Sequence, residues 1–149
     1  MSGRIVVGVD GSDTARFAAR WAAHEARRRG AVLEMVCAWE VPTNTSGTGY
    51  VLATDDLVEG LVRNAEETLA AAGETVRLEA GQIPVETRAL EGPAVRVLLE
   101  ASKGADLLVL GSRGLGGFRE LLLGSVSQHC AHHATCPVVI VRHADPVAA

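Results

Sequence analysis

The sequence predicts an α/β protein with a doubly wound parallel sheet, and three observations lead to that fold class. Short apolar runs alternate with longer segments of helical periodicity, the pattern of strand–helix–strand units. The run Leu107-Leu108-Val109-Leu110 has the length and composition of a strand buried on both faces. With 48% apolar and 3% aromatic residues, the core is expected to consist of Val, Leu and Ala. One domain, residues 1–149, is expected at this length.

Caps and helix breakers set the expected boundaries of the helices and strands. Asp13 is a candidate N-cap for the first helix, and Gly30 is placed to end it. Pro93 suits the first turn of the third helix, whereas Gly73 is a weak point within the second. In chain order we expect a strand at 4–9, a helix at 13–29, a strand at 32–39, a helix at 55–78, a strand at 85–90, a helix at 93–102, a strand at 107–110, a helix at 125–133 and a strand at 138–141.

The first helix is expected to be amphipathic. Its apolar residues recur at helical spacing and predict a buried face made of Ala18, Trp21, Ala22 and Ala26. Its basic residues fall on the remaining surface and are expected to face water; these are Arg16, Arg20, Arg27 and Arg28.

Composition also limits the classes of partner. A net charge of −4 gives no broad basic field, which argues against nucleic acid or an anionic membrane as the main partner. No apolar run approaches the length of a membrane span, and the N-terminus lacks the apolar core of a signal peptide. Three cysteines at scattered spacing suit reduced thiols better than a disulfide framework. A cytoplasmic location is therefore expected.

The segment from Gly111 to Ser127 carries the strongest functional signal. Four glycines occur within seven residues directly after the strand at 107–110, where an anion can approach bare backbone N–H groups. The pair Gly124-Ser125 then opens the next helix. A strand, a glycine-rich loop and a helix N-terminus with hydroxyl groups form an arrangement that binds phosphate.

Two common nucleotide motifs do not fit this sequence. A Walker A loop needs Gly-Lys-Ser/Thr, and that triplet is absent. A dinucleotide fingerprint that starts at Gly8 would need glycine in place of Asp10 and Asp13. The later pair Gly114-x-Gly116 would need a third glycine at the position of Arg119. A P-loop enzyme and a generic dehydrogenase are therefore disfavoured.

Another spacing does fit: Gly111-x2-Gly114-x9-Gly124-Ser125, with all three intervals met. With the opening run Ile5-Val6-Val7-Gly8-Val9-Asp10-Gly11-Ser12, it makes the chain resemble universal stress proteins of the ATP-binding type over essentially its whole length. The resemblance implies a Rossmann-like sheet of order 3-2-1-4-5, which would bring Asp10 and the glycine loop to the crevice where the strand order reverses. It also implies ATP as the ligand, with magnesium held through the phosphates rather than by the protein.

For the nucleoside end of the ligand, the resemblance implies three contacts. The Asp10 carboxylate would bond the ribose hydroxyls or the adenine edge, the backbone of Ala38 would contact adenine, and Leu110 would add an apolar wall. Asp-Gly is also a common turn dipeptide, so Asp10 has an alternative role in capping the first helix or holding a turn.

For the phosphate end, the hydroxyls of Ser125 and Ser127 would join the backbone of Val126 on the β- and γ-phosphates. Arg113 lies inside the motif and could pair with a phosphate, whereas Arg119 could equally be a solvated surface residue. In the alternative view the glycines are a flexible connection and the serines an ordinary helix start. The expected ATP-binding set is Gly8, Asp10, Ala38, Leu110, Gly111, Arg113, Gly114, Gly124, Ser125, Val126 and Ser127.

A second cluster of reactive residues lies near the C-terminus. His129 and His133 are four residues apart on a helix, a spacing that can hold zinc, and Cys130, His132 and Cys136 lie beside them. The zinc-protease glutamate is absent from between the two histidines, and no second cluster completes a site, so a structural role is favoured and no protein-held metal is expected. Cysteine–histidine catalysis is disfavoured because these residues precede the last strand, away from the crevice. Cys37 is expected to be a core or pocket-edge residue.

The function predicted from these observations is an ATP-binding regulatory or stress-response module. No residue is placed as a catalytic base and no arginine finger is identifiable, so at most slow hydrolysis or autophosphorylation is expected, and no catalytic residue is assigned. Two alternatives stay open: a nucleotide-hydrolysing or nucleotidyl-transferring enzyme on the same framework, and an interaction protein with a vestigial pocket.

The last strand predicts a homodimer. Val138–Val141 is apolar at every position, so both of its faces need cover. In the order 3-2-1-4-5 it is also a sheet edge, where a twofold axis would pair it with its own copy. The alternatives are that residues 142–149 fold back over this edge or that the strand is too short to recruit a partner. The adenine nucleotide and a second copy are thus the expected partners.

Overall fold

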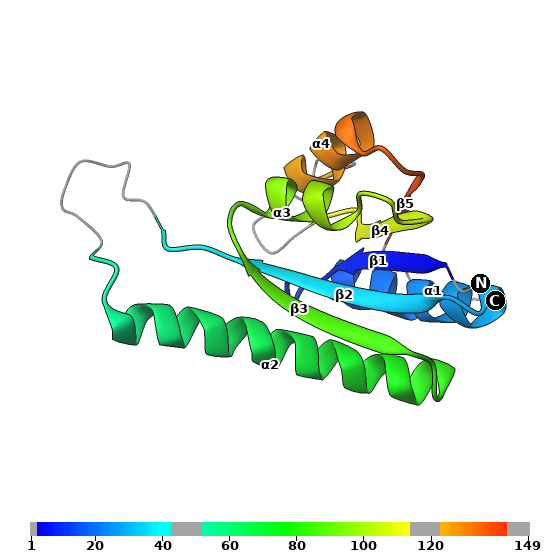
Figure 1. The fold of residues 1–149 in the computed structure, drawn as a ribbon, viewed down its shortest axis with the longest axis horizontal. Helices are drawn as coiled ribbons and strands as arrows, with labels where there is room; N and C mark the ends of the chain where they lie inside the picture. Colours follow the sequence, from blue (N-terminus) through cyan, green and yellow to red (C-terminus); the bar gives the residue numbers. More distant parts are fainter. Residues whose placement is uncertain (1–2, 43–51, 114–122, 143–149) are drawn as a thin grey trace, which may run out of the picture.

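Figure 1 shows a twisted sheet with a pair of helices on each side of it. This computed structural model describes residues 3–42, 52–113 and 123–142. The elements are β1 (Arg4–Gly8), α1 (Asp13–Arg29), β2 (Val32–Trp39), α2 (Asp55–Ala80), β3 (Val85–Glu91), α3 (Ala94–Ala101), β4 (Leu107–Gly111), α4 (Ser125–His133) and β5 (Val138–Val141). The five strands are parallel and follow the order β3-β2-β1-β4-β5, so the predicted fold class and strand order are confirmed.

The strand order places two connections at the same edge of the sheet. β1 lies between β2 and β4, with Val7 opposite Met35 on one side and Val109 on the other. The chain leaves β1 toward Asp10 and leaves β4 through Gly111. Because these strands are parallel neighbours, both connections begin at the carboxyl edge of the sheet. The order reverses between β1 and β4, and ligands of doubly wound sheets bind at such a point.

Each face of the sheet is buried under its own pair of helices. α1 and α2 pack on the face formed by the odd-numbered residues of β1, β2 and β4, such as Val7, Met35 and Val109. α3 and α4 pack on the opposite face, where Leu98 and Cys130 meet the even-numbered strand residues. The alternation of side chains along each strand divides the apolar residues between two cores, so helices on both faces are confirmed.

Helix α1 begins and packs slightly differently from the prediction. Ser12, not Asp13, is the N-cap, because its Oγ accepts a hydrogen bond from the Ala15 N–H at 3.2 Å. Trp21 was expected on the buried face but is 37% exposed. The side of α1 that lies close to the sheet is lined by small alanine side chains. Trp21 lies beside this alanine-lined side, partly in solvent. The alanines that are buried there are Ala15, Ala18, Ala19, Ala22, Ala23 and Ala26.

Several boundaries differ from the expected ones by one or two residues. β1 ends at Gly8 instead of residue 9. β3 and β4 are each one residue longer than expected, because Glu91 pairs with Trp39 and Gly111 pairs with Val141. α2 continues through Gly73 and two residues beyond the expected end, to Ala80, because this alanine is buried against the sheet layer. α3 is shorter than expected, with Pro93 outside it as the N-cap.

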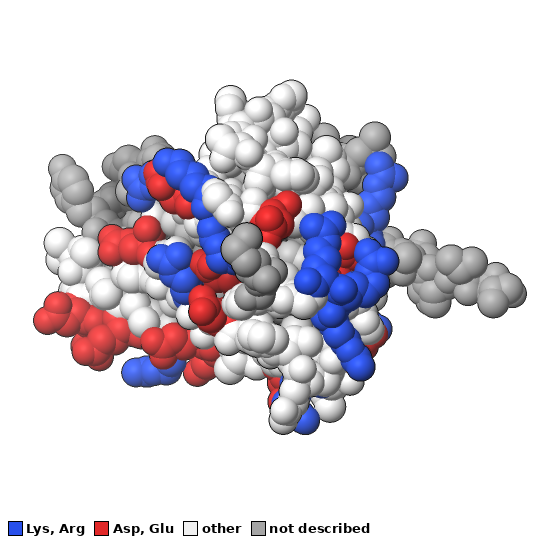
Figure 2. Space-filling view, turned by 45° about the vertical axis from the view of Figure 1, so that its right-hand side comes forward, with Lys and Arg blue, Asp and Glu red and all other residues white. Residues whose placement is uncertain are grey.

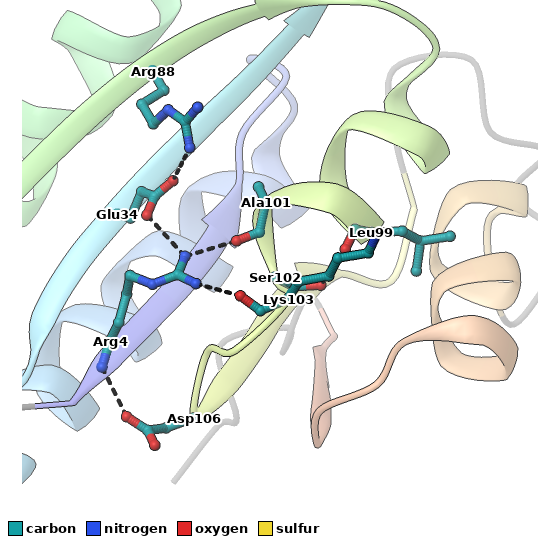
Figure 3. Close-up of polar contacts among 8 residues, drawn as sticks. All are labelled: Arg4, Glu34, Arg88, Leu99, Ala101, Ser102, Lys103 and Asp106. Atoms are coloured by element: carbon teal, nitrogen blue, oxygen red, sulfur yellow. Dashed lines mark hydrogen bonds and ion pairs between the residues drawn. The ribbon is translucent and has the colours of Figure 1, made fainter.

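A buried carboxylate connects three strands at the amino side of the sheet. Glu34 on β2 has a side chain that is only 4% exposed, and it lies between Arg4 and Arg88, with N–O distances of 3.0 and 3.1 Å (Figure 3). Arg4 also donates to the carbonyl oxygens of Ala101 and Lys103, each at 2.7 Å. Arg4 thereby joins β1 to β2 and to the end of α3.

Surface charge is mixed on the face that Figure 2 shows, where groups of basic side chains have acidic neighbours. Arg27, Arg28 and Arg29 end α1, and Glu25 pairs with the last two of them. Cations at a helix C-terminus also interact favourably with the helix dipole. Within the described ranges, no helix is long and apolar enough to cross a membrane.

Candidate functional site

The first turn of α1 lies directly against the last residue of β4. A Cβ atom built on Gly111 would come within 2.7 Å of the backbone carbon of Thr14 and 2.8 Å of its hydroxyl oxygen. Real side chains do not tolerate such distances to backbone, so this position requires glycine. The predicted Gly111 is therefore explained in the first place by the close approach of a helix.

The three carbonyl groups that lead into the glycine-rich loop are all engaged. Gly111 O accepts from Ser127 Oγ at 2.5 Å, Ser112 O accepts from the Gly124 N–H at 2.6 Å, and Arg113 O accepts from Thr14 Oγ1. These donors belong to the start of α4 and the start of α1. Carbonyl oxygens that are held by protein donors cannot turn toward a bound anion.

Within the part of the chain that the structure describes, the N-terminus of α4 has no side-chain cap. Its N-cap, Gly124, provides no side-chain hydrogen bond, and the first turn, from Ser125 on, contains no acidic residue. Gly124 has a φ of −72° and a ψ of 165°, which other residues also adopt, so backbone strain does not explain the glycine. The partial positive charge of this helix end favours an anion, and among the described residues no side chain caps its first-turn N–H groups.

Two of the predicted phosphate ligands differ in their surroundings. Ser125 is exposed at the start of α4, as a ligand contact requires. Ser127 is 3% exposed, and its hydroxyl is already used on Gly111 O. Ser127 thus supports the end of β4, and the expected contact of its hydroxyl with phosphate stays a prediction. Val126 turns its side chain into the core beneath α3 and α4, which leaves its backbone for the predicted contact.

Asp10 combines the two roles considered for it. Its Oδ1 accepts a hydrogen bond from the Ser12 N–H at 2.9 Å, so the carboxylate does hold the turn before α1. The residue is also exposed at the carboxyl edge of the sheet. Burial, and secondarily the negative charge of Asp10, raises the pKa of the Cys37 thiol to about 11. The carboxylate therefore acts on the end of β2, beside Ala38, as well as on its own turn.

The other predicted nucleoside contacts are mainly core positions. A Cβ on Gly8 would meet methyl carbons of Leu98 and Leu110 at 3.0 Å, so glycine lets these leucines close over β1. Leu110 is only 3% exposed, and its role as an apolar wall for adenine stays a prediction. Ala38 is half-buried near the end of β2, opposite Leu90 of β3.

Some of the expected residues cannot be placed. Gly114, Gly116, Gly117 and Arg119 lie outside the described residues. Arg113 is described and half-buried, and it takes part in a further interaction besides its carbonyl hydrogen bond. Its pairing with a phosphate stays a prediction.

A pocket of about 320 Å³ opens beside this edge, between α1 and α2. Gly11 and Ser12 form part of its wall, and Thr68 and Thr75 of α2 lie on the other side. The pocket therefore touches the back of the turn that Asp10 holds.

The histidine and cysteine cluster is dispersed over α4 and the following turn. Cys130 is fully buried in the core, whereas His129, His132 and His133 are exposed. Burial raises the pKa of the Cys130 thiol to about 11, which keeps it protonated at neutral pH. In the part of the chain that the structure describes, no three His, Cys, Asp or Glu side chains are grouped to hold a metal ion.

Thr14 and Ser112 contribute to this site but were not among the predicted residues. Their partners are distant in sequence, since 99 residues separate Thr14 from Arg113. A local pattern shows Thr14 only as a polar residue in the first turn of a helix. The signal that could have identified Thr14 in the sequence is its position in the first turn after β1, the strand whose carboxyl end faces the crevice.

The fold and the position of the α4 N-terminus define a class: a doubly wound α/β domain with a glycine-capped helix end at the switch point of its sheet. The model of the universal stress protein family matches residues 1–142, and the chain belongs to this family.

Relatives and solved structures agree with this assignment. A universal stress protein of Mycobacterium tuberculosis is 38% identical over 151 residues, which cover 95% of this chain and 52% of that protein. The chain thus spans about half the length of the first curated relatives that it matches.

Two nucleotide complexes are among the similar structures. A universal stress protein in complex with cAMP is 32% identical, with a TM-score of 0.71, over 95% of this chain and 98% of that one. A universal stress protein from Archaeoglobus fulgidus in complex with dAMP is 27% identical, with a TM-score of 0.65, over 93% and 97%. Relatives of this chain therefore bind adenine nucleotides.

Proposed function

We propose that residues 1–149 form one cytoplasmic, ATP-binding regulatory module of the stress response. The open N-terminus of α4 carries this proposal. It lies next to three carbonyls that are held away from the loop, and such an end favours a phosphate group. The cAMP and dAMP complexes of similar proteins support an adenine nucleotide as the ligand.

The nucleotide would lie across the carboxyl ends of β1 and β4. Asp10 is exposed at the nucleoside end, where its carboxylate can accept hydrogen bonds from ribose hydroxyls or the adenine amino group. The phosphates would lie against the glycine-rich segment and the first turn of α4 at Ser125. The described residues provide no carboxylate cluster for a metal, so magnesium would be held by phosphate oxygens and water.

Calorimetric titration of the purified protein tests the ligand. We expect MgATP to bind with a dissociation constant at or below about 100 μM, roughly 5.5 kcal/mol of binding free energy. Mass spectrometry of the protein as purified is expected to find an adenine nucleotide. Absence of bound nucleotide together with no heat from ATP would favour an interaction protein with a vestigial pocket and would overturn the proposal.

Turnover separates a regulatory module from an enzyme. No residue of the described site is placed as a general base, and we propose slow hydrolysis or autophosphorylation at most. Steady phosphate release above about one per second would instead favour a nucleotide-hydrolysing enzyme.

We also propose a homodimer through β5, which is an edge strand of the sheet. All four residues, Val138–Val141, stay partly exposed, although each is apolar. An antiparallel pair of β5 strands around a twofold axis would cover them. Light scattering should give twice the monomer mass at tens of micromolar, and Val139→Lys should give the monomer. A wild-type monomer at that concentration would contradict the dimer.

A further inference from the structure

We infer that Thr14 is a positioning residue that couples the nucleoside end of the nucleotide site to its phosphate end. This inference rests on the proposed function. The Thr14 side chain is not expected to touch the ligand, because the residue is 7% exposed. Its effect would pass through the two backbone segments that it joins.

One of these segments is the entrance to the glycine-rich loop. The Thr14 hydroxyl donates to Arg113 O, and the Thr14 backbone fills the space where Gly111 would carry a Cβ. Gly111 O is held from the other side by Ser127. The end of β4 is thus fixed between the first turn of α1 and the first turn of α4.

The other segment is the turn that carries Asp10. The Asp10 carboxylate accepts from the Ser12 N–H at 2.9 Å, and the Ser12 and Thr14 hydroxyl oxygens are 3.5 Å apart. Ser12 Oγ also accepts from the Ala15 N–H. A continuous chain of polar contacts therefore runs from Asp10 through Ser12 and Thr14 to Arg113.

The physical effect concerns the direction of one carbonyl group. A phosphate is stabilised by N–H groups and repelled by carbonyl oxygens. While Thr14 donates to it, Arg113 O is held toward α1. Without the Thr14 hydroxyl this donor is lost, and we expect the Arg113 carbonyl oxygen to turn toward the bound anion more readily. The loss should therefore grow with the number of phosphates.

The test compares ATP with AMP by competition titration. Thr14→Val keeps the branched shape and removes the hydroxyl, and we expect it to weaken ATP about tenfold, or ~1.4 kcal/mol. The affinity for AMP should fall by less than about threefold. Thr14→Ser, which restores the donor, should recover most of the ATP affinity. Thr87→Val is the control, because Thr87 is exposed on β3, which is separated from β4 by two strands of the sheet.

The outcomes separate the inference from the proposed function. A wild-type protein that binds neither nucleotide contradicts the function itself. Equal weakening of ATP and AMP by Thr14→Val means that Thr14 is only structural, and unchanged affinity for both means that the coupling is absent. If Thr14→Val does not fold, Thr14→Ala and Thr14→Ser are compared with each other, and the inference fails when their ATP-to-AMP affinity ratios agree.

Discussion

Helices α1 and α4 begin at the same edge of the sheet, yet their N-termini are built in opposite ways. At α1 the side chain of Ser12 accepts from the Ala15 N–H, and Asp13 adds a negative charge in the first turn. At α4 the N-cap is Gly124, which gives no side-chain hydrogen bond, and the first turn carries no acid. The first helix caps one of its own donors with a side chain, whereas the described residues give the second helix no such cap.

This difference suits α1 to a scaffold role and α4 to the proposed contact with phosphate. The closed end of α1 is rigid enough to hold Asp10 and to press against Gly111. The open end of α4 gives up the stability of a cap, about 1 kcal/mol. We expect changes at α1 to alter mainly the free energy of unfolding and changes at α4 to alter mainly nucleotide affinity.

Closing the α4 end should have the largest effect. Gly124→Asp adds a capping carboxylate where the phosphates would bind, and we expect ATP affinity to fall about a hundredfold, or ~2.7 kcal/mol. The free energy of unfolding should stay level or rise by a few tenths of a kcal/mol. Calorimetry and chemical denaturation measure the two quantities. Gly124→Asn is the uncharged control, with a smaller expected loss. Undiminished ATP binding by Gly124→Asp would place the phosphates elsewhere.

Removing the carboxylate at the α1 side should come next. Asp10→Ala should weaken ATP by roughly 1–3 kcal/mol, because a charge-assisted hydrogen bond to the nucleoside is lost. The affinity for inorganic triphosphate should fall much less, since this ligand lacks the nucleoside. Titrations with the two ligands give the comparison. Equal losses would show that Asp10 only holds its turn.

Opening the α1 end should reduce stability. Ser12→Ala removes the side-chain acceptor for Ala15 N, and we expect the free energy of unfolding to fall by about 1 kcal/mol. Urea denaturation followed by circular dichroism measures this. A loss of ATP affinity larger than the loss for Thr14→Val would contradict the assignment of Ser12 to the scaffold.

The opposite end of α1 should show a smaller, pH-dependent effect. Hydrogen bonds from Arg28 and then Arg29 hold the pKa of Glu25 below its ordinary value of 4.5. Because the pKa is lower in the folded protein, this carboxylate stabilises the fold above about pH 4.5, and the contribution is lost as the pH falls through the folded value. Glu25→Gln should flatten that part of the stability profile. An unchanged acid profile would mean that these pairs contribute nothing.

The regular elements could be predicted because local signals agree with tertiary packing. Val32–Trp39, Ser125–His133 and Val138–Val141 match the expected ranges, since apolar runs and helical periodicity are properties of neighbouring residues. Gly30, with φ of 63°, ends α1 as predicted, because glycine adopts that conformation without strain. The position of Trp21 was predicted wrongly. Helical periodicity shows which side of α1 faces the sheet, but it does not show that the helix packs too closely there for a large side chain.

The candidate site was predictable only in part. The glycine spacing predicts a phosphate end and the resemblance to a family implies a nucleoside contact for Asp10, and both stay predictions. The hydrogen bonds of Thr14 to Arg113 and of Ser127 to Gly111 depend on how α1 and α4 dock against β4. A single sequence contains no local pattern for such contacts, because the partners are brought together only by the folded sheet.

The buried Glu34 has a consequence for strand pairing. Its neighbours Leu33 and Met35 face the alanine-rich layer of α1 and α2, whereas Glu34 faces Arg4 and Arg88. A slip of β2 by one residue would carry the carboxylate into that apolar layer and leave both arginines without it. Because the Glu34 side chain is only 4% exposed, such a slip would leave a nearly buried carboxylate without either arginine, and the two ion pairs therefore favour the observed register of β2.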